Sequence, residues 1–191
     1  AVRDRAMGFC LFGNVGVAAQ YARKTLGVQR VLIADWDVHH GNGTQALVQD
    51  DPNIRFVSMH QWPFYPGTGP SADRGPHNNV WNVPMRAALP PERYIEAFEQ
   101  TFDQALDGFD PGLIIVSAGF DCMAGDPIGG FTLGMEDIDR LTRFVVGRAE
   151  EVCGGRVVSV LEGGYNPATL GLATVVHLRA LSGLAEPGHG Q

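Results

Sequence analysis

Short apolar runs alternate along the chain with longer segments that have helical patterns. The apolar runs are rich in Val and Ile, as is typical of strands buried on both faces, and they cover residues 30–37, 54–60, 113–119 and 156–164. Helical patterns cover residues 14–27, 90–109, 135–155 and 166–184. This alternation predicts an α/β fold with a mainly parallel sheet and flanking helices.

Polar residues gather where the predicted strands end, at Asp35, Asp37, His39, Ser58, His60, Asp121, Asp126, Glu162 and Tyr165. In open α/β sheets, ligands bind beyond the carboxyl ends of the strands. Four strands therefore direct polar groups to one rim of the sheet. A long Gly- and Pro-rich loop from Gln61 to Asn79 adjoins this rim, and loops of that length are often functional.

The segment "IADWDVHHGNGTQ" predicts a metal site. Because strand side chains alternate, Asp35, Asp37 and His39 should face one side, whereas His40 faces the other and is expected to be structural. A carboxylate and an imidazole two residues apart can share a metal ion, and two oxygens with one nitrogen suit Zn²⁺, leaving a position for water. A hydrogen-bonded cluster without metal is the alternative.

The third ligand should come from another strand end. The segment "GFDCMAGDPIGG" offers Asp121 and Asp126. We favour Asp126, because it lies between Gly125 and Pro127 on a constrained turn, and Asp121 would then only hold the loop.

Tyr165 follows the segment "LEGG", in which two glycines allow the backbone to approach a ligand closely. Its hydroxyl could donate a hydrogen bond to an oxygen that becomes negative during a reaction. A tyrosine packed at a strand–helix junction is the alternative. Of the remaining histidines, His177 is expected to be structural, His60 and His77 are open, and His189 lies in a tail.

Composition excludes several classes of protein. The chain has 191 residues, 45% of them hydrophobic and 18% charged, and its net charge of −7 argues against direct nucleic-acid binding. It has no run of eighteen apolar residues, so no membrane partner is expected. Three widely spaced cysteines, without a recognisable signal peptide, indicate a reducing compartment, the cytoplasm for a bacterial protein or the nucleus for a eukaryotic one. The oligomeric state is not predicted.

Five ordered motifs carry a resemblance: "GFCLFGN", "ADWDVHHGNGTQ", "FYPGTG", "SAGFDCMAGDP" and "LEGGYN". From about Met7 to Leu184 the chain resembles the zinc-dependent histone deacetylase family, which includes acetylpolyamine amidohydrolases and acetoin-utilisation-type proteins. It is closer to the class II and bacterial branch than to class I. The resemblance implies the arginase–deacetylase fold.

The resemblance also implies roles for individual residues. Asp37, His39 and Asp126 would bind one Zn²⁺, and Tyr165 would be the catalytic tyrosine that polarises the acetyl carbonyl. The acyl-lysine channel would be lined by Gly8, Phe9, Tyr65, Leu133 and Gly164. A structural K⁺ would be bound by Asp35, Asp37, His39, Ser58 and Met59. Asp35 and Asn42 would orient two catalytic histidines.

Those two histidines are the main departure from the family pattern. In the family, an adjacent histidine pair that includes the general base lies just before the segment equivalent to residues 1–10. We therefore expect residues 1–191 to be a partial catalytic domain, incomplete at the N-terminus, with a tail at 185–191. Such a chain should expose apolar sheet surface and be poorly soluble or only partly folded.

The predicted function is zinc-dependent amide hydrolysis. It would release acetate from acetyl-lysine in proteins, or from acetylated polyamines or other small amides. One alternative is an arginase-like hydrolase with two metal ions, but the position two residues after His39, where such enzymes place a further carboxylate, is Gly41. A non-catalytic module that binds metal and acylated ligands is another.

Overall fold

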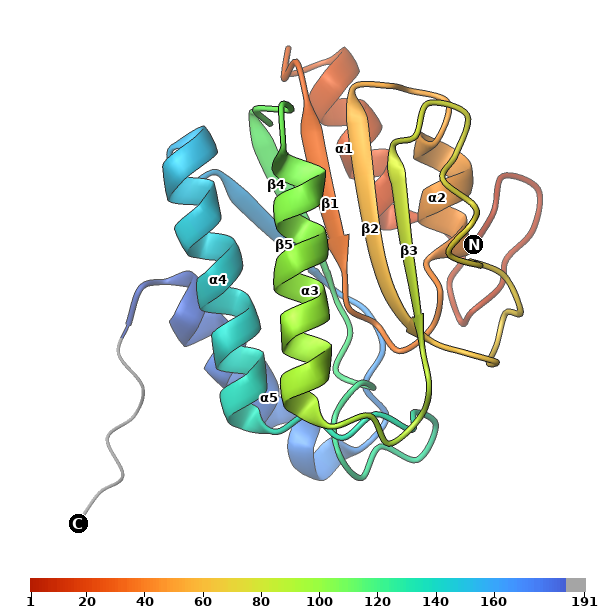
Figure 1. Ribbon diagram of the computed structural model, residues 1–191, viewed down its shortest axis with the longest axis vertical. Helices are drawn as coiled ribbons and strands as arrows, with labels where there is room; N and C mark the ends of the chain where they lie inside the picture. The colour runs from red at the N-terminus through yellow and green to blue at the C-terminus, as the bar shows by residue number, and fades with distance from the viewer. Residues whose placement is uncertain (185–191) are drawn as a thin grey trace.

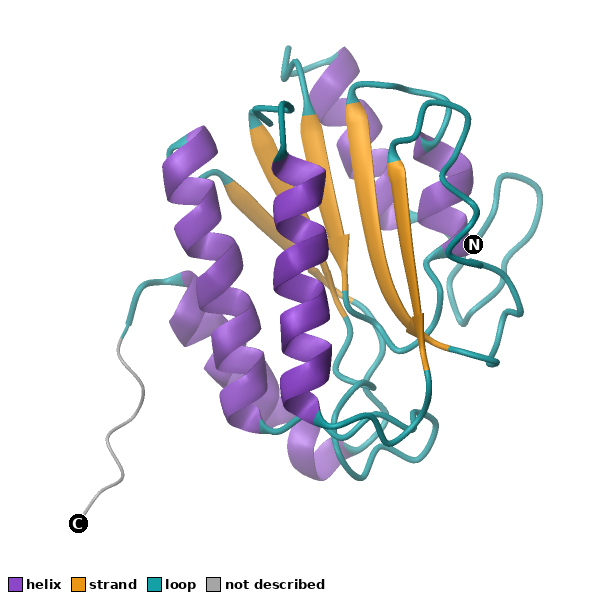
Figure 2. Cartoon of the chain, viewed as in Figure 1, coloured by secondary structure: helices purple, strands orange, loops and turns teal. Residues whose placement is uncertain are grey.

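A computed structural model describes residues 1–184 and shows one parallel sheet between two layers of helices (Figures 1 and 2). The strands are β1 (Val31–Asp35), β2 (Ile54–Gln61), β3 (Val80–Met85), β4 (Leu113–Ala118) and β5 (Val157–Leu161). The helices are α1 (Asn14–Lys24), α2 (Asn42–Val48), α3 (Pro91–Leu106), α4 (Met135–Cys153) and α5 (Pro167–Leu181). The strand order is β3-β2-β1-β4-β5, and each neighbouring pair is parallel.

The predicted α/β architecture is confirmed, but α2 and β3 were not predicted. The sequence of α2 begins with Asn-Gly, a turn signal, and is too short to show a helical period. The sequence of β3 contains Pro84, which lacks the N–H that a strand donates. Pro84 is accommodated because β3 is an edge strand that pairs only with β2.

The central strand β1 explains how the helices are placed. All five of its residues are buried, and the four apolar ones alternate between two apolar clusters. Leu32 and Ala34 belong to the cluster that includes α3 and α4. Val31 and Ile33 belong to the cluster that includes α1. Both faces of β1 are therefore covered, as its continuous apolar sequence predicts.

The opposite edge strand, β5, is less well covered. Val158 is 45% exposed and Leu161 57% exposed, although both are apolar strand residues. On the neighbouring α5, Leu172, Val175 and Leu178 are each more than half exposed. We call these five residues the apolar edge. The inner side of α5, in contrast, buries Ala173, His177 and Ala180.

No helix in residues 1–184 combines the length and the apolar character needed to cross a membrane. The predicted tail at 185–191, with His189, lies outside the described residues.

Candidate metal centre

The polar rim predicted from the sequence forms at the carboxyl ends of β1, β2 and β4. We use the name polar rim for Asp35, Asp37, His39, Ser58 and Asp121. Strand β1 ends at Asp35, whose Oδ1 accepts a hydrogen bond from the backbone N–H of Asp37 at 3.1 Å. The Oδ1 of Asp37 accepts one in turn from the N–H of His39 at 2.8 Å. The carboxylates therefore fold the chain after β1 and orient His39.

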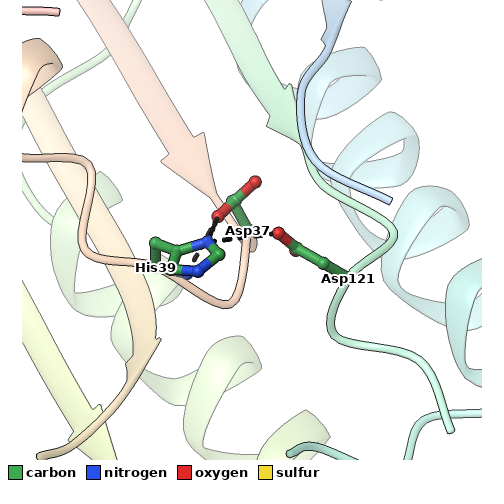
Figure 3. A group of neighbouring side chains, drawn as sticks. All are labelled: Asp37, His39 and Asp121. Carbon is green, nitrogen blue, oxygen red and sulfur yellow. Dashed lines mark hydrogen bonds and ion pairs between the residues drawn. The ribbon is translucent and has the colours of Figure 1, made fainter. Parts of the chain in front are cut away.

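Asp37, His39 and Asp121 form a group of three candidate ligands (Figure 3). Their ligand atoms all lie within 4.8 Å of one another. His39 Nδ1 lies 2.9 Å from Asp37 Oδ1 and 3.2 Å from Asp121 Oδ2. Two carboxylate oxygens thus point toward one imidazole nitrogen, which can donate a single proton.

Asp121 is held so that one oxygen remains available. Its Oδ1 accepts a hydrogen bond from the backbone N–H of Val38 at 2.8 Å. Its Oδ2 is buried and has no hydrogen-bond partner, despite its short distance to His39. A buried carboxylate oxygen without a donor is costly unless a cation neutralises it. This observation favours a metal ion at the group.

Glycines bring the backbone close to the two carboxylates. A Cβ on Gly163 would lie 2.1 Å from Asp121 Oδ2 and 2.7 Å from Asp37 Oδ2. The N–H of Gly163 donates to Asp37 Oδ2 at 2.9 Å. Gly163 of the "LEGG" motif therefore leaves space for the two carboxylates, because any side chain at Gly163 would occupy their position.

The titration of the group reflects its need for positive charge. Burial on its own lowers the pKa of His39, but the close approach of the Asp121 and Asp37 carboxylates and their charges raise that pKa to about 9. Burial and the charge of Asp37 raise the pKa of Asp121 to about 6. The two carboxylates therefore favour positive charge at this group.

Asp126, which the sequence analysis favoured as the third ligand, does not belong to this group. Its Oδ1 accepts hydrogen bonds from the N–H groups of Ile128 and Gly129 at 2.9 and 3.1 Å. Its Oδ2 accepts one from the N–H of Tyr165 at 2.7 Å. The constrained turn does hold Asp126 still, but it directs the carboxylate to the backbone. Asp121 is thus a second candidate for the third ligand, and Asp126 as a ligand stays a prediction, because a carboxylate that accepts hydrogen bonds keeps further lone pairs.

Tyr165 lies beside the group and its ring meets Phe9 edge to face, with the ring centroids 5.8 Å apart. Burial and the charges of Asp121 and Asp37 raise the pKa of Tyr165 to about 12. The hydroxyl is therefore protonated at neutral pH and can act as a hydrogen-bond donor.

A pocket of about 650 Å³ is lined by two of the candidate ligands, Asp37 and His39, whereas Asp121 is fully buried and does not line it. Of the predicted channel residues, Gly8, Phe9 and Tyr65 line it. Leu133 and Gly164 are not among its lining residues, and Leu133 is 1% exposed within the core. Phe64, Ser117, Ile128 and Glu162 are among the lining residues that were not predicted to belong to the channel.

Phe64 and Tyr65 form an aromatic wall against His39. The Phe64 ring stacks on the imidazole, with centroids 5.3 Å apart and planes 17° apart. The Tyr65 ring meets it edge-on at 6.0 Å, and the Tyr65 hydroxyl accepts a hydrogen bond from the N–H of Gly8 at 3.2 Å. The motif "FYPGTG" thus contributes both rings to the pocket.

The residues predicted to orient histidines also line the pocket. Asp35 is buried, and burial together with the charges of Asp37 and Glu162 raises its pKa well above the usual value. The Asn42 amide donates to the sulfur of Met7 at 3.4 Å. Ser58, a predicted K⁺ ligand, pairs with Asp35 in the sheet register. Met59, another predicted K⁺ ligand, is fully buried, and the K⁺ site itself stays a prediction.

The remaining histidines occupy different surroundings. His40, His60 and His177 are buried, as expected for His40 and His177. His77 is exposed.

Comparisons of the sequence and the structure with known proteins all indicate the same family. Residues 1–181 match the family described as "Histone deacetylase domain". An uncharacterized protein of Synechocystis sp., slr0245, is 44% identical over 181 residues, which are 95% of this chain and 58% of that protein. A histone deacetylase-like amidohydrolase of Pseudomonas aeruginosa is 39% identical, over 95% of this chain and 49% of its own length.

A solved structure, the crystal structure of the HDA15 HD domain, matches with a TM-score of 0.88 and 36% identity. The match covers 96% of this chain and 54% of that one. The chain therefore spans about half the length of the proteins it matches.

Proposed function

Since the chain belongs to the histone deacetylase family, we propose that its pocket is the metal-binding part of a zinc-dependent deacetylase site. Asp37, His39 and Asp121 would hold one Zn²⁺. The observation that carries this proposal is their convergence within 4.8 Å, with Asp121 Oδ2 buried and without a donor. The reaction would be hydrolysis of an acylated amine, with release of acetate from an acetylated one.

The choice of Zn²⁺ rests on the donor atoms. One imidazole nitrogen and two carboxylate oxygens suit a borderline cation and leave a fourth position for water or substrate. A second metal would need a further carboxylate close to the first three. The residue two positions after His39 is Gly41, so a site for one ion is favoured.

A bound Zn²⁺ would polarise the acyl carbonyl and lower the pKa of a coordinated water. Tyr165 would donate its hydroxyl proton in a hydrogen bond to the carbonyl oxygen as that oxygen becomes negative. Its pKa of about 12 keeps the hydroxyl protonated for this role. Removing one such donor typically costs about 3–4 kcal/mol of transition-state stabilisation.

The contacts of Asp126 support a positioning role, beside its predicted role as a metal ligand. Its carboxylate binds the Tyr165 backbone N–H at 2.7 Å and also the turn at Ile128, a residue of the pocket lining. It would therefore position both the tyrosine and one apolar contact of the substrate. This role needs no bond from Asp126 to the metal.

The family resemblance implies that an adjacent pair of histidines accepts the proton. Asp35 and Asn42 line the pocket, where they could orient such histidines. The substrate would be acetyl-lysine in a protein or an acetylated polyamine, because the aromatic wall and Phe9 offer apolar sides for an aliphatic chain.

The test is acetate release by the full-length protein that carries this chain. An acetyl-lysine peptide and an acetylated polyamine would each be supplied, with added Zn²⁺ and after treatment with a chelator. Zinc-dependent release is expected, and Tyr165→Phe should lower kcat by about 100-fold or more with little change in zinc content. Full activity of Tyr165→Phe would remove this residue from the mechanism, and zinc binding without any turnover would favour a non-catalytic binding module.

A further inference from the structure

The loop that carries the aromatic wall is anchored by two further histidines, which do not belong to the group of candidate metal ligands. His40 and His60 are both buried, and their ring centroids lie 4.8 Å apart. They contact Thr68 and Gly69, which follow Phe64 and Tyr65 within a few residues. We use the name clasp for His40, His60, Thr68 and Gly69.

Hydrogen-bond directions show that His40 is held from both sides. The Gln45 amide group donates to the carboxylate of Asp73 at 2.7 Å, so the Gln45 Oε1 is the acceptor. His40 Nε2–H must therefore donate to Gln45 Oε1, at 2.9 Å. The other ring nitrogen, Nδ1, pairs with the hydroxyl of Thr68 at 2.8 Å. His40 thus ties the loop to helix α2.

His60 fixes the next residue of the loop. Its Nε2 lies 2.9 Å from the carbonyl oxygen of Gly69, which can only accept, so Nε2–H donates. Its Nδ1 lies 3.2 Å from the hydroxyl of Ser58, a residue of the polar rim. The loop is therefore attached to strand β2 as well as to α2.

Gly69 allows the loop backbone to lie directly on the two rings. A Cβ at this position would lie 2.6 Å from ring atoms of His40 and 2.8 Å from His60 Nε2, and the φ of Gly69 is +88°. Gly67, two residues earlier, also has a positive φ, of +80°, but a Cβ there would meet nothing within 4 Å. The two glycines share the backbone conformation and differ in their contact with the histidines.

We propose that the clasp sets the distance between the aromatic wall and His39, and thereby determines how tightly the pocket grips the aliphatic chain of an acylated amine. His40 and His60 are positioning residues, since they act through the loop that carries Phe64 and Tyr65. This proposal about the clasp rests on the proposed function, because that function implies a ligand that passes along the aromatic wall.

The consequence is that two adjacent histidines would have different roles. His39 would bind the metal, whereas the adjacent His40 would hold the wall that stacks on His39. A disturbed clasp should therefore weaken binding of a long chain and leave the metal site nearly unchanged. A purely structural role would weaken both together.

Two metal-binding probes separate these effects in the zinc-loaded, full-length protein. Acetohydroxamate can bind the metal but has no chain, whereas octanoyl hydroxamate has the same binding group and an aliphatic chain that would lie along the wall. Gly69→Ala should lower affinity for the octanoyl probe by about tenfold or more, a difference of about 1.4 kcal/mol. Its affinity for acetohydroxamate should change by less than about threefold, and Gly67→Ala should leave both affinities close to wild type.

Thr68→Val is the milder second variant, because it removes only the hydroxyl that pairs with His40 Nδ1. It should weaken the octanoyl probe alone, and Thr68→Ser should restore the affinity. Equal octanoyl affinities for Gly69→Ala and Gly67→Ala, or equal losses for both probes, would overturn the clasp. A wild-type protein that binds zinc but neither probe would instead overturn the proposed function and, with it, the clasp.

Discussion

The polar rim and the apolar edge lie on the same sheet, but each lacks a different kind of partner. In the polar rim, Asp35, Ser58 and Asp121 are nearly inaccessible to solvent, and the buried Oδ2 of Asp121 has no hydrogen-bond partner. In the apolar edge, Leu161 and Leu172 are 57% and 63% exposed. The polar rim is a buried polar site that a bound cation would stabilise. The apolar edge is an exposed surface that contact with another apolar surface would stabilise.

The two regions meet at the pocket, because β5 ends at Leu161, which lines the pocket together with Glu162. Hydrogen bonds therefore fix the side of the pocket that holds the metal ligands. The side formed by the end of β5 and by Phe9, which is 86% exposed, is more open.

The largest expected effect is a loss of zinc affinity at the polar rim. It is tested by comparing variants of the two aspartates that follow β4. Asp121→Asn should weaken zinc binding by more than about 100-fold, since loss of a residue that merely orients a ligand already costs about 10- to 100-fold. Asp126→Asn should retain most of the zinc affinity, because its carboxylate contacts backbone N–H groups. Zinc titration against a competing chelator measures both. A larger loss for Asp126→Asn would restore the assignment made from the sequence.

The next effect is a loss of stability at low pH, and it concerns His177 on the inner side of α5, next to the apolar edge. Burial lowers the pKa of His177 to about 4, and its ring nitrogens pair with the hydroxyls of Thr142 and Ser159, each at 2.7 Å. In the unfolded chain, its pKa should be about 6.5. The unfolded state therefore binds more protons between these values, and stability that is complete above pH 6.5 is lost as the pH falls to 4.

The size of this loss should be up to about 3 kcal/mol of unfolding free energy. Urea unfolding at pH 7 and pH 4.5 would measure it, with His177→Gln as the matched variant because glutamine does not titrate. The variant should lose less stability on acidification, and the remaining loss would include His60, whose pKa burial also lowers to about 4. An unchanged pH dependence in His177→Gln would contradict the buried, neutral state of His177.

The smallest effect concerns the outer face of α5. Replacing Leu172, Val175 and Leu178 together with glutamine in the 191-residue chain should change stability by no more than about 0.5 kcal/mol per site, as for other exposed positions. Light scattering should show less self-association, because a contiguous apolar surface promotes it. Ala173→Gln is the control on the same helix, since Ala173 is fully buried and overpacking costs about 1–3 kcal/mol. Strong destabilisation by the triple variant would show that the outer face is covered.

The sequence predicted the strands and helices that carry a clear apolar period and failed where local signals were mixed. Pro84 concealed β3, and the Asn-Gly start of α2 resembled a turn. The position of the site could be predicted, because parallel strands bring their carboxyl ends to one edge of the sheet.

The choice between Asp121 and Asp126 could not be made from the sequence. Both follow β4 within a few residues, and a constrained turn is good evidence that a side chain is fixed but says nothing about what it contacts. The channel role of Leu133 stays a prediction for a related reason, since an apolar residue in a glycine-rich loop can line a channel or fill the core, and Leu133 is 1% exposed. Ile128, which does line the pocket, lies on the turn that Asp126 holds.

The central claim is that one Zn²⁺ binds to Asp37, His39 and Asp121. The most direct measurement is X-ray diffraction from zinc-loaded crystals on both sides of the zinc absorption edge, which locates the ion by its anomalous scattering. The account predicts one peak per chain, about 2.0–2.2 Å from an oxygen of each of the two aspartates and about 2.0–2.1 Å from a His39 ring nitrogen. A peak at Asp126, or two peaks a few ångströms apart, would contradict it.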